Sequence, residues 1–391
     1  MRQLGAEGFP WHNPDRRSPE HDQRLRHLAR RLIWRAWPAP ARFIAALAAI
    51  ILWPIRSRAD TRRLINAANV DALPPGMFWS AWGAALRHNI PPAEFGGFGI
   101  PETAHTGADH WLFTREASLL SAHLTSKSVS DLCGDKVRFA EFCSRNGSLS
   151  VVSPLAVISA NKFSQAFDGD TPPTRDLVVK PVRNSQGRRC ELWTYRDGGH
   201  VRQNDGKTFL ANNFIDHLRA TSDTDPGGLV VQAYVPPHPG LSPLAELGPP
   251  VARIVTGRWP DHRVELIDAM IQKPRADGWL THGGPIRLID HETGRFCDRR
   301  PGPHVFPDLT DDPVFDGLKL ERWSDCVPGL CALHKMIPDQ APLIGWDVIF
   351  SPDGPVVLEA NTTLAPFFFQ VARQATAADG RWSELLASYL P

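Results

Sequence analysis

Two carboxylates lie near the end of the chain, one in each arm of a sequence that is typical of a β-hairpin. The stretch IGWDVIFSPDGPVVLEAN, residues 344–361, has two apolar runs on either side of a Pro-Asp-Gly turn signal. A turn centred on Asp353 would pair Asp347 directly with Glu359. Asn361 would then lie on the same face, two residues further along. The alternatives are a solvent-facing hairpin and a register in which the two acids diverge.

Like charges that face each other in a sheet repel, and apolar flanks raise the cost, so a cation is expected between these acids. A hard divalent cation suits these two carboxylates together with Asn361. Two carboxylates and an amide oxygen, completed by phosphate oxygens and water, form the octahedral shell in which nucleotide enzymes usually hold magnesium. The sequence therefore predicts Mg²⁺ ligands at Asp347, Glu359 and Asn361.

A lysine in a strand pattern is the second feature. Lys180 lies in DLVVKPV, and an unpaired ammonium is costly in such a β-branched strand, so Lys180 is expected to contact an anion. The polar turn that follows has small residues whose backbone N–H groups could cover phosphates, namely Asn184, Ser185 and Gly187. A salt bridge followed by an ordinary hairpin turn would have the same pattern.

Two more strand patterns carry groups that suit a nucleotide. The strand LVVQAYV ends at two prolines, which leaves backbone groups free to read an adenine edge at Gln232, Ala233, Tyr234 and Val235. Arg253 in VARIVTG and Lys273 after LIDAMIQ are cations that could converge on a phosphate or an acyl-phosphate. Any edge strand that ends at a proline, or any exposed salt bridge, would show the same features.

The elements that must position these groups are mostly strands. Strand-like runs recur between residues 149 and 361, with turn residues between close neighbours, which favours antiparallel pairing. A helix is expected before them in DKVRFAEFCSRNG, because its apolar residues lie on one face and Gly147 suits a C-cap. Helices kept apart from antiparallel strands indicate an α+β fold.

Composition limits the class of protein. A chain of 391 residues with 42% hydrophobic residues can bury a large core or two to three packed units. Its formal charge of +1 predicts no general attraction to nucleic acid. Six cysteines without a C-x-x-C pair favour reduced thiols in a cytoplasmic protein. The motifs of nucleophile-elbow hydrolases, zinc proteases, Rossmann sites and protein kinases are missing from the sequence.

The first part of the chain differs from the rest. Twelve arginines but only three acids lie in residues 16–63, around the apolar run FIAALAAIILWPI at 43–55. This run is shorter than the roughly 20 residues of a membrane-spanning helix, and it has neither the position nor the cleavage pattern of a signal peptide. Residues 16–63 could dock on the folded body with their arginines in solvent. They could instead make a peripheral membrane contact, with the apolar run in the interface.

Taken in order, these motifs resemble those of the ATP-grasp superfamily over residues 120–391. The chain is most similar to the sugar-transfer-associated ATP-grasp family, on the evidence of ARIVTG, HGGPIRLIDHETG, IGWDV and LEANTTLAPFFFQ. The order of these elements is far more specific than any one of them. The resemblance implies an ATP-grasp fold, in which two α+β subdomains, 120–235 and 236–391, grip ATP. An N-terminal helical extension, 1–63, and a connecting region, 64–119, would precede them.

The resemblance also implies a role for each residue above. The implied nucleotide contacts are the phosphate-binding lysines Lys136 and Lys180, the loop with Asn184, Ser185 and Gly187, and the adenine-reading segment Gln232 to Val235. The implied metal ligands are Asp347, Glu359 and Asn361, and the groups that stabilise the transferred phosphoryl are Arg253 and Lys273. Gln232 stands where relatives often have an acid, and the loop has fewer glycines than theirs.

The reaction usual for the superfamily is ligation. ATP phosphorylates a carboxylate, and an amine or another nucleophile then displaces the phosphate, with ADP released. The family name suggests a small-molecule or saccharide-linked substrate in cell-surface polysaccharide modification, and we expect a cytoplasmic protein that can contact the inner face of the membrane. One alternative is an ATP-grasp kinase that phosphorylates a small molecule. Another is a non-catalytic nucleotide-binding component of a membrane-associated assembly.

Overall fold

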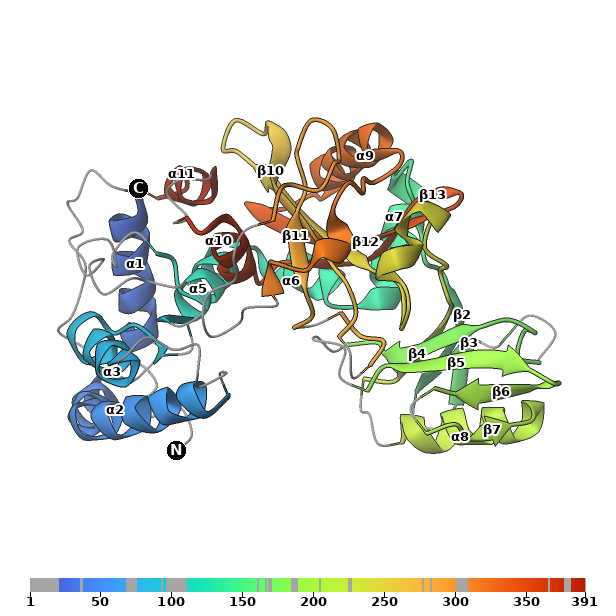
Figure 1. Ribbon diagram of the computed structural model, residues 1–391, viewed down its shortest axis with the longest axis horizontal. Helices are drawn as coiled ribbons and strands as arrows, with labels where there is room; N and C mark the ends of the chain where they lie inside the picture. Colours follow the sequence, from blue (N-terminus) through green and yellow to red (C-terminus); the bar gives the residue numbers. More distant parts are fainter. Residues whose placement is uncertain are drawn as a thin grey trace.

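Two β-sheets form the body of the protein (Figure 1). The computed structural model describes residues 21–35, 38–67, 76–92, 94–95, 111–159, 162–165, 167, 171–183, 189–203, 205–223, 227–275, 278–281, 283–299, 309–364, 366–375 and 381–390. Within them, neighbouring strands pair antiparallel except for β1 with β13. The predicted α+β class with mainly antiparallel strands is therefore confirmed.

The larger structural unit is built on a six-stranded sheet with the order β1-β13-β12-β9-β10-β11. Its strands are β1 (Ser150–Val151), β9 (Val251–Arg258), β10 (Val264–Gln272), β11 (Ile286–Leu288), β12 (Leu343–Ser351) and β13 (Gly354–Asn361). The chain thus leaves this sheet after β1 and returns to it at β9. Between the two it forms the second sheet.

The second sheet has seven strands in the order β3-β2-β8-β4-β5-β6-β7. They are β2 (Pro154–Ser159), β3 (Lys162–Gln165), β4 (Leu177–Pro181), β5 (Glu191–Arg196), β6 (Gly199–Arg202), β7 (Thr208–Phe209) and β8 (Leu229–Ala233). Helix α8 (Ala211–Ser222) packs on it through Phe214, whose ring centroid lies 4.9 Å from that of Trp193. This aromatic contact anchors the smaller core.

Helices cover both faces of the six-stranded sheet. On one face, α7 (Lys136–Asn146) and α9 (Trp323–Met336) form a core with the sheet that includes Phe139, Leu330 and Trp346. On the other face, α5 (Thr114–Leu124), α10 (Phe367–Arg373) and α11 (Arg381–Ala387) bury Leu120 and Leu385 against Val255. Other short helices of the body include α6 (Lys127–Cys133), η5 (Pro239–Leu244) and η7 (Pro313–Phe315).

Residues 136–151 pack with the six-stranded sheet, whereas the subdomain boundaries implied by the resemblance place them with residues up to 235. The physical reason is burial. Phe139 and Cys143 of α7 lie in the same core as Trp346, and β1 extends the sheet beside β13. Within the described residues, the strands β2 to β8 form the separate smaller sheet.

The predicted N-terminal helices are present as α1 (His21–Arg35) and α2 (Ala39–Ala67), with α3 (Met77–His88) after them. Helix α1 docks on the body, because its buried Arg26 and Arg30 pair with Glu116 of α5 at 2.9 and 2.8 Å. Helix α2 packs on α3. None of the helices in the described ranges is long and apolar enough to span a membrane.

Candidate active site

The hairpin of β12 and β13 brings the two acids together. Asp347 is the direct cross-strand partner of Glu359, so the predicted pair is confirmed. The predicted turn is wrong, because Ser351 pairs with Gly354 and the turn is therefore centred between Pro352 and Asp353. An irregularity beside Asp347 compensates for this shift: Val348 pairs with Val357, which leaves Leu358 as an extra residue in β13.

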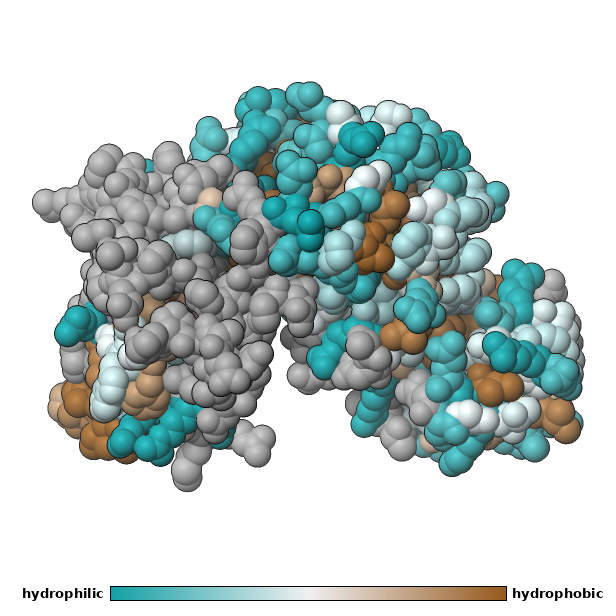
Figure 2. Space-filling model, viewed as in Figure 1, coloured by the Kyte–Doolittle hydropathy of each residue, from teal (hydrophilic) through white to brown (hydrophobic). Residues whose placement is uncertain are grey.

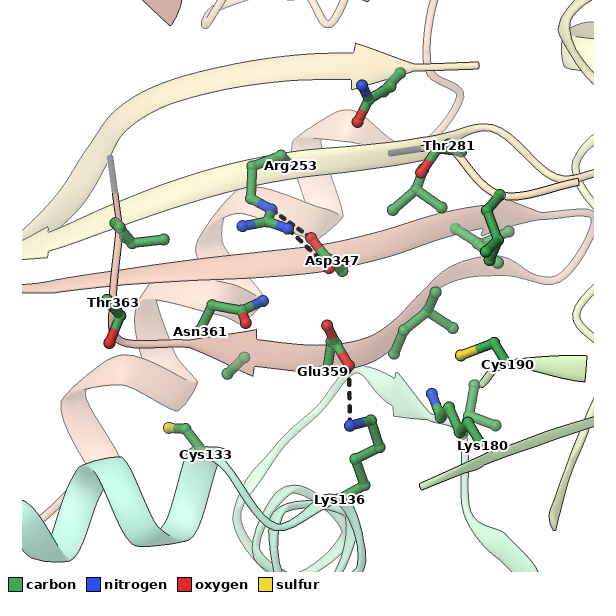
Figure 3. A pocket seen from close by; sticks show the side chains of 18 of the residues that line it. Cys133, Lys136, Lys180, Cys190, Arg253, Thr281, Asp347, Glu359, Asn361 and Thr363 are labelled. Atoms are coloured by element: carbon green, nitrogen blue, oxygen red, sulfur yellow. Dashed lines mark hydrogen bonds and ion pairs between the residues drawn. The ribbon is translucent and has the colours of Figure 1, made fainter. Parts of the chain in front are cut away.

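This β-bulge decides where Glu359 points. Val357 and Ala360 both lie in the core under α7 and α9, although they are three residues apart. In a regular strand Glu359 would share the face of Val357 and would enter that core. With Leu358 as the extra residue, Glu359 and Asn361 instead line the cavity beside Asp347 (Figure 3).

A row of charged side chains crosses three neighbouring strands at this point. Arg253 of β9 is the direct neighbour of Asp347 on β12. Its Nη2 donates to Asp347 Oδ2 at 3.0 Å, and its Nε forms an ion pair with Oδ1 of the same carboxylate. On the other side of the row, Lys136 Nζ lies 3.6 Å from Glu359 Oε2. Figure 3 shows the row with both contacts.

The two lysines come from different structural units, Lys136 from the first turn of α7 and Lys180 from β4. The side chain of Asp135 caps α7 by accepting hydrogen bonds from the backbone of Val137 and Arg138. Asp135 also pairs at 2.9 Å with Arg183, which follows β4. This bond holds the start of the helix at the end of the strand, so both ammonium groups lie near Glu359 (Figure 3).

Burial and charge set the pKa values of the cluster. Burial lowers the pKa of Lys180, although the negative charge of Glu359 opposes this shift. Burial alone would raise the pKa of Glu359, but Lys180 and Lys136 outweigh it and lower that pKa. Burial raises the pKa of Asp347 to about 7, opposed by Arg253 and reinforced by Glu359. In the protein alone the negative charge of Glu359 acts on Lys180 but does not offset the cost of its burial.

A cavity of about 1000 Å³ lies between the two sheets. Among the residues in its lining are ten that the sequence singled out: Lys136, Lys180, Gln232, Ala233, Tyr234, Val235, Arg253, Asp347, Glu359 and Asn361. Lys273 is not in the lining, and its Nζ pairs with Asp312 at 2.5 Å. The proposed phosphate loop, with Asn184, Ser185 and Gly187, lies outside the described residues.

Several polar groups of the segment expected to read adenine already have partners. The side-chain amide of Gln232 donates to the carbonyl of Val152 at 2.7 Å, and the side chain is buried. The backbone N–H of Tyr234 donates to the carbonyl of Asp176 at 3.0 Å. Adenine recognition therefore stays a prediction, and it falls mainly on the backbone beyond Tyr234.

Asp347, Glu359 and Asn361 fit a magnesium ion by the chemistry of their donors. Within the described ranges no group of three or more His, Cys, Asp or Glu side chains is arranged to hold a metal, so an ion here would rely on two carboxylates and an amide. The buried Nδ2 of Asn361 has no hydrogen-bond partner among the described atoms. Rotating this amide by about 180° would present Oδ1 in its place. Phosphate oxygens and water would complete the shell that Mg²⁺ prefers.

Sequence reasoning missed part of the cavity wall. Cys190 lies beside Lys180, and Thr281 and Thr363 add hydroxyl groups from two other segments (Figure 3). Phe368 and Trp382 bring aromatic rings from α10 and α11. One signal was available, because two threonines directly follow Asn361 in LEANTTLAP. Phe368 lies in the same stretch, LEANTTLAPFFFQ, whereas Cys190, Thr281 and Trp382 come from distant parts of the sequence, and no local pattern connects them.

Two β-sheets that enclose one cavity, with lysines and a carboxylate pair in its wall, are typical of the ATP-grasp class of proteins. The chain belongs to the Sugar-transfer associated ATP-grasp family, whose model matches residues 116–381. The match includes the charged and amide residues of the cavity, namely Lys136, Lys180, Arg253, Asp347, Glu359 and Asn361. The helices α1 to α3 precede it.

Three similar solved structures are remote in sequence. D-cycloserine synthetase DcsG has 13% identity over 70% of this chain and 78% of that chain, with a TM-score of 0.38. VanG D-Ala:D-Ser ligase from Enterococcus faecalis has 13% identity over 68% of this chain and 61% of that chain, with a TM-score of 0.38. D-alanine–D-alanine ligase from Bacillus anthracis, complexed with ATP, has 14% identity over 69% and 66%, with a TM-score of 0.37. This chain thus spans less than two thirds of the length of either ligase. The chain matches no curated protein.

Proposed function

We propose that the protein is an ATP- and Mg²⁺-dependent ligase that activates a carboxylate as an acyl-phosphate. The observation that carries this proposal is the pairing of Asp347 with Glu359 in the wall of a cavity that also contains two buried lysines. In the protein alone Arg253 pairs with Asp347 and Lys136 pairs with Glu359, yet burial still raises the pKa of Asp347 to about 7 and lowers the pKa of Lys180, so a further cation and a further anion would be favourable here. A magnesium-bound triphosphate supplies both, and family membership points to the same ligand.

Each described residue of the cluster then has a role. Lys180 and Lys136 bind the phosphates through their ammonium groups. Asp347, Glu359 and Asn361 would hold magnesium, which neutralises charge on the phosphate oxygens when it is bound. Arg253 pairs with Asp347 beside this set, and its guanidinium would stabilise the transferred phosphoryl group. The same role for Lys273 rests on the sequence alone, because its ammonium pairs with Asp312 and the residue is not in the cavity lining.

The proposed reaction has two steps. An oxygen of the substrate carboxylate attacks the γ-phosphorus, the bond from phosphorus to the β,γ-bridging oxygen breaks, and ADP leaves. An amine or another nucleophile then forms a bond to the acyl carbon, the carbon–oxygen bond to phosphate breaks, and the nucleophile loses one proton. Such chemistry is catalysed chiefly by positioning and by fixed positive charge, which the lysines and Arg253 provide.

The substrate and the location are part of the proposal. The family description links the fold to sugar transfer, so we propose a saccharide-linked or other small-molecule substrate, within the modification of a cell-surface polysaccharide. Hydroxyl and aromatic side chains in the cavity, such as Thr281, Thr363 and Trp382, suit a polar ring. Use of ATP and cysteines without disulfide bonds are both typical of cytoplasmic proteins. We therefore propose that the protein acts in the cytoplasm, at the inner face of the membrane.

The test is a titration with a non-hydrolysable ATP analogue, with and without Mg²⁺. We expect wild-type protein to bind the analogue in a magnesium-dependent way, and Glu359→Ala to lose about tenfold or more of that affinity. Glu321→Ala is the matched control, because Glu321 is exposed and pairs only at the surface with Lys319. Equal affinity and equal magnesium dependence in wild type and Glu359→Ala would contradict the proposal.

Product analysis separates a ligase from a kinase. A ligase releases ADP and phosphate and needs both a carboxylate and a nucleophile for turnover. A kinase accumulates a phosphorylated substrate as its final product, and that result would overturn the ligase assignment. Nucleotide binding without turnover across a panel of carboxylates and amines would favour a non-catalytic component.

A further inference from the structure

Helix α2 has two chemically different faces. Its buried face carries small residues and one indole at a spacing of four, namely Ala45, Ala49, Trp53, Ser57 and Thr61. This face packs on α3, where Trp53 Nε1 donates to the carbonyl of Ala85 at 2.9 Å. Small residues allow close packing of the two helices, so α2 has a defined orientation relative to α3.

The opposite face of α2 is apolar and open to solvent. Phe43, Ile44, Ile51 and Ile55 are 70%, 67%, 65% and 63% exposed. Leu47, Ile50 and Leu52 add to the exposed apolar surface of the same helix. Single exposed apolar residues are common, but a contiguous group of this size marks an interaction surface. Figure 2 shows these brown side chains grouped where Figure 1 labels α2.

Basic side chains continue this face along the helix. Arg58 and Arg62 follow Ile51 and Ile55 at helical spacings of three and four, and both are exposed. Helix α2 carries five arginines and one aspartate, which gives a net charge of +4. The aspartate, Asp60, is the neighbour of Arg56 at 4.0 Å and of Arg63 at 3.4 Å.

We propose that this face of α2 binds the surface of an anionic lipid bilayer, with the helix lying in the interface. The apolar half would enter the boundary between headgroups and acyl chains, and Arg58 and Arg62 would contact lipid phosphates. The apolar run of 43–55 extends over about 20 Å at 1.5 Å per residue, which is shorter than the bilayer core. An apolar run of this length does not span the bilayer core, and it suits a helix that lies on the membrane.

Charge favours this occupant over a second copy of the chain. Two copies joined through this face would bring helices of charge +4 against each other, whereas an anionic bilayer neutralises them. Helix α1 links the bundle of α2 and α3 to the body through the buried ion pairs of Glu116. Binding through α2 would therefore hold the whole protein at the membrane. The proposal goes beyond the ligase activity and does not depend on it.

Co-sedimentation of the full chain with vesicles tests the proposal. We expect binding to vesicles of phosphatidylglycerol in phosphatidylcholine to exceed binding to phosphatidylcholine alone by about tenfold or more, and to weaken with salt. The double variant Ile44→Asp, Ile51→Asp should lose about tenfold or more of the binding, because it places charges in the apolar face. Arg58→Gln with Arg62→Gln should reduce the preference for anionic lipid and leave the weaker apolar binding.

The matched control is Leu210→Asp with Leu247→Asp. These side chains are 61% and 43% exposed and lie on other parts of the surface, so this variant should bind vesicles as wild type does. Unfolding temperature checks that every variant is folded. Failure of folded wild type to sediment with anionic vesicles would overturn the proposal, and so would undiminished binding by the aspartate variant. Light scattering that shows a lipid-free dimer, abolished by the same variant, would assign the face to a second copy and would overturn it as well.

Discussion

Replacing Lys180 by methionine should separate nucleotide binding from stability. The Lys180 side chain lies on β4 and is only 8% exposed, and burial lowers the pKa of its ammonium even though Glu359 is near. A net lowering means that the folded protein disfavours the charge relative to water. Methionine has a similar length and no charge, so it can occupy the same space without that cost.

The expected magnitudes have opposite signs. Replacement of a buried charge by an apolar side chain of similar volume is neutral or stabilising by about 1–4 kcal/mol. Here the gain should be near the low end, about 1 kcal/mol, because Glu359 loses one cation but keeps Lys136 at 3.6 Å. A hydrogen bond to a charged phosphate contributes about 1.5–3 kcal/mol, so nucleotide affinity should fall by about 10- to 150-fold.

Urea unfolding without ligand and calorimetric titration with an ATP analogue and Mg²⁺ measure the two quantities. Lys207→Met is the control, because Lys207 is a 66% exposed lysine of the smaller structural unit that pairs with Asp205, and this variant should change neither quantity by much. If Lys180→Met lowered the free energy of unfolding by more than about 1 kcal/mol and left affinity unchanged, the lysine would be a structural ion-pair partner. The phosphate assignment of Lys180 would then fail.

Two further predictions concern buried ionisable groups outside the cavity. Glu116→Gln removes the buried carboxylate that both Arg26 and Arg30 contact, so α1 should undock at a cost of about 3–5 kcal/mol, seen as faster hydrogen exchange in α1; the exposed Glu141→Gln should not do this. The second concerns His334, whose Nε2–H donates to the carbonyl of Ala341 at 2.8 Å while Nδ1 accepts from Thr256 Oγ1 at 2.8 Å. Burial lowers the pKa of His334 to about 3, so the neutral form is favoured in the folded state. The stability it contributes is present above the unfolded pKa near 6.5 and is lost as pH falls towards 3, by about 3 kcal/mol at pH 4.5. In His334→Gln the urea unfolding midpoint should depend less on pH between about 6.5 and 4.5 than in wild type. An unchanged slope over this range would contradict the reasoning.

Much of the body was predictable because its signals are local. The helix of α7 followed from apolar spacing, and the structure adds the Asp135 cap at its start. The hairpin followed from two apolar runs and a turn signal. Lys180 and Arg253 stand out as charges on strands, Lys136 is implied by the family resemblance, and all three reach the cavity. Local sequence patterns therefore indicate which charged residues need a partner of opposite charge.

Partners were harder to predict, because they depend on pairing between distant strands. Arg253 was expected to contact phosphate, yet strand order places it beside Asp347, which it binds in the protein alone. Lys273 follows β10 directly, but the chain beyond that strand brings Asp312 to its ammonium. The N-terminal segment was interpreted as either docked or membrane-facing. In the structure α1 is docked, whereas the apolar face of α2 stays open.

The β-bulge at Leu358 explains why a wrong turn position still predicted the correct pair of Asp347 and Glu359. A turn centred on Asp353 gave Asp347 opposite Glu359, but the observed two-residue turn would by itself pair Asp347 with Leu358. In the run VVLEA nothing local distinguishes the residue that is extra. Tertiary packing makes the choice: the core accepts Val357 and Ala360, and with one residue added between them the carboxylate of Glu359 faces the cavity. A regular strand would bury Glu359 under α7 at a cost of several kcal/mol. The bulge therefore lets one strand supply both a dry core face and a charged cavity face.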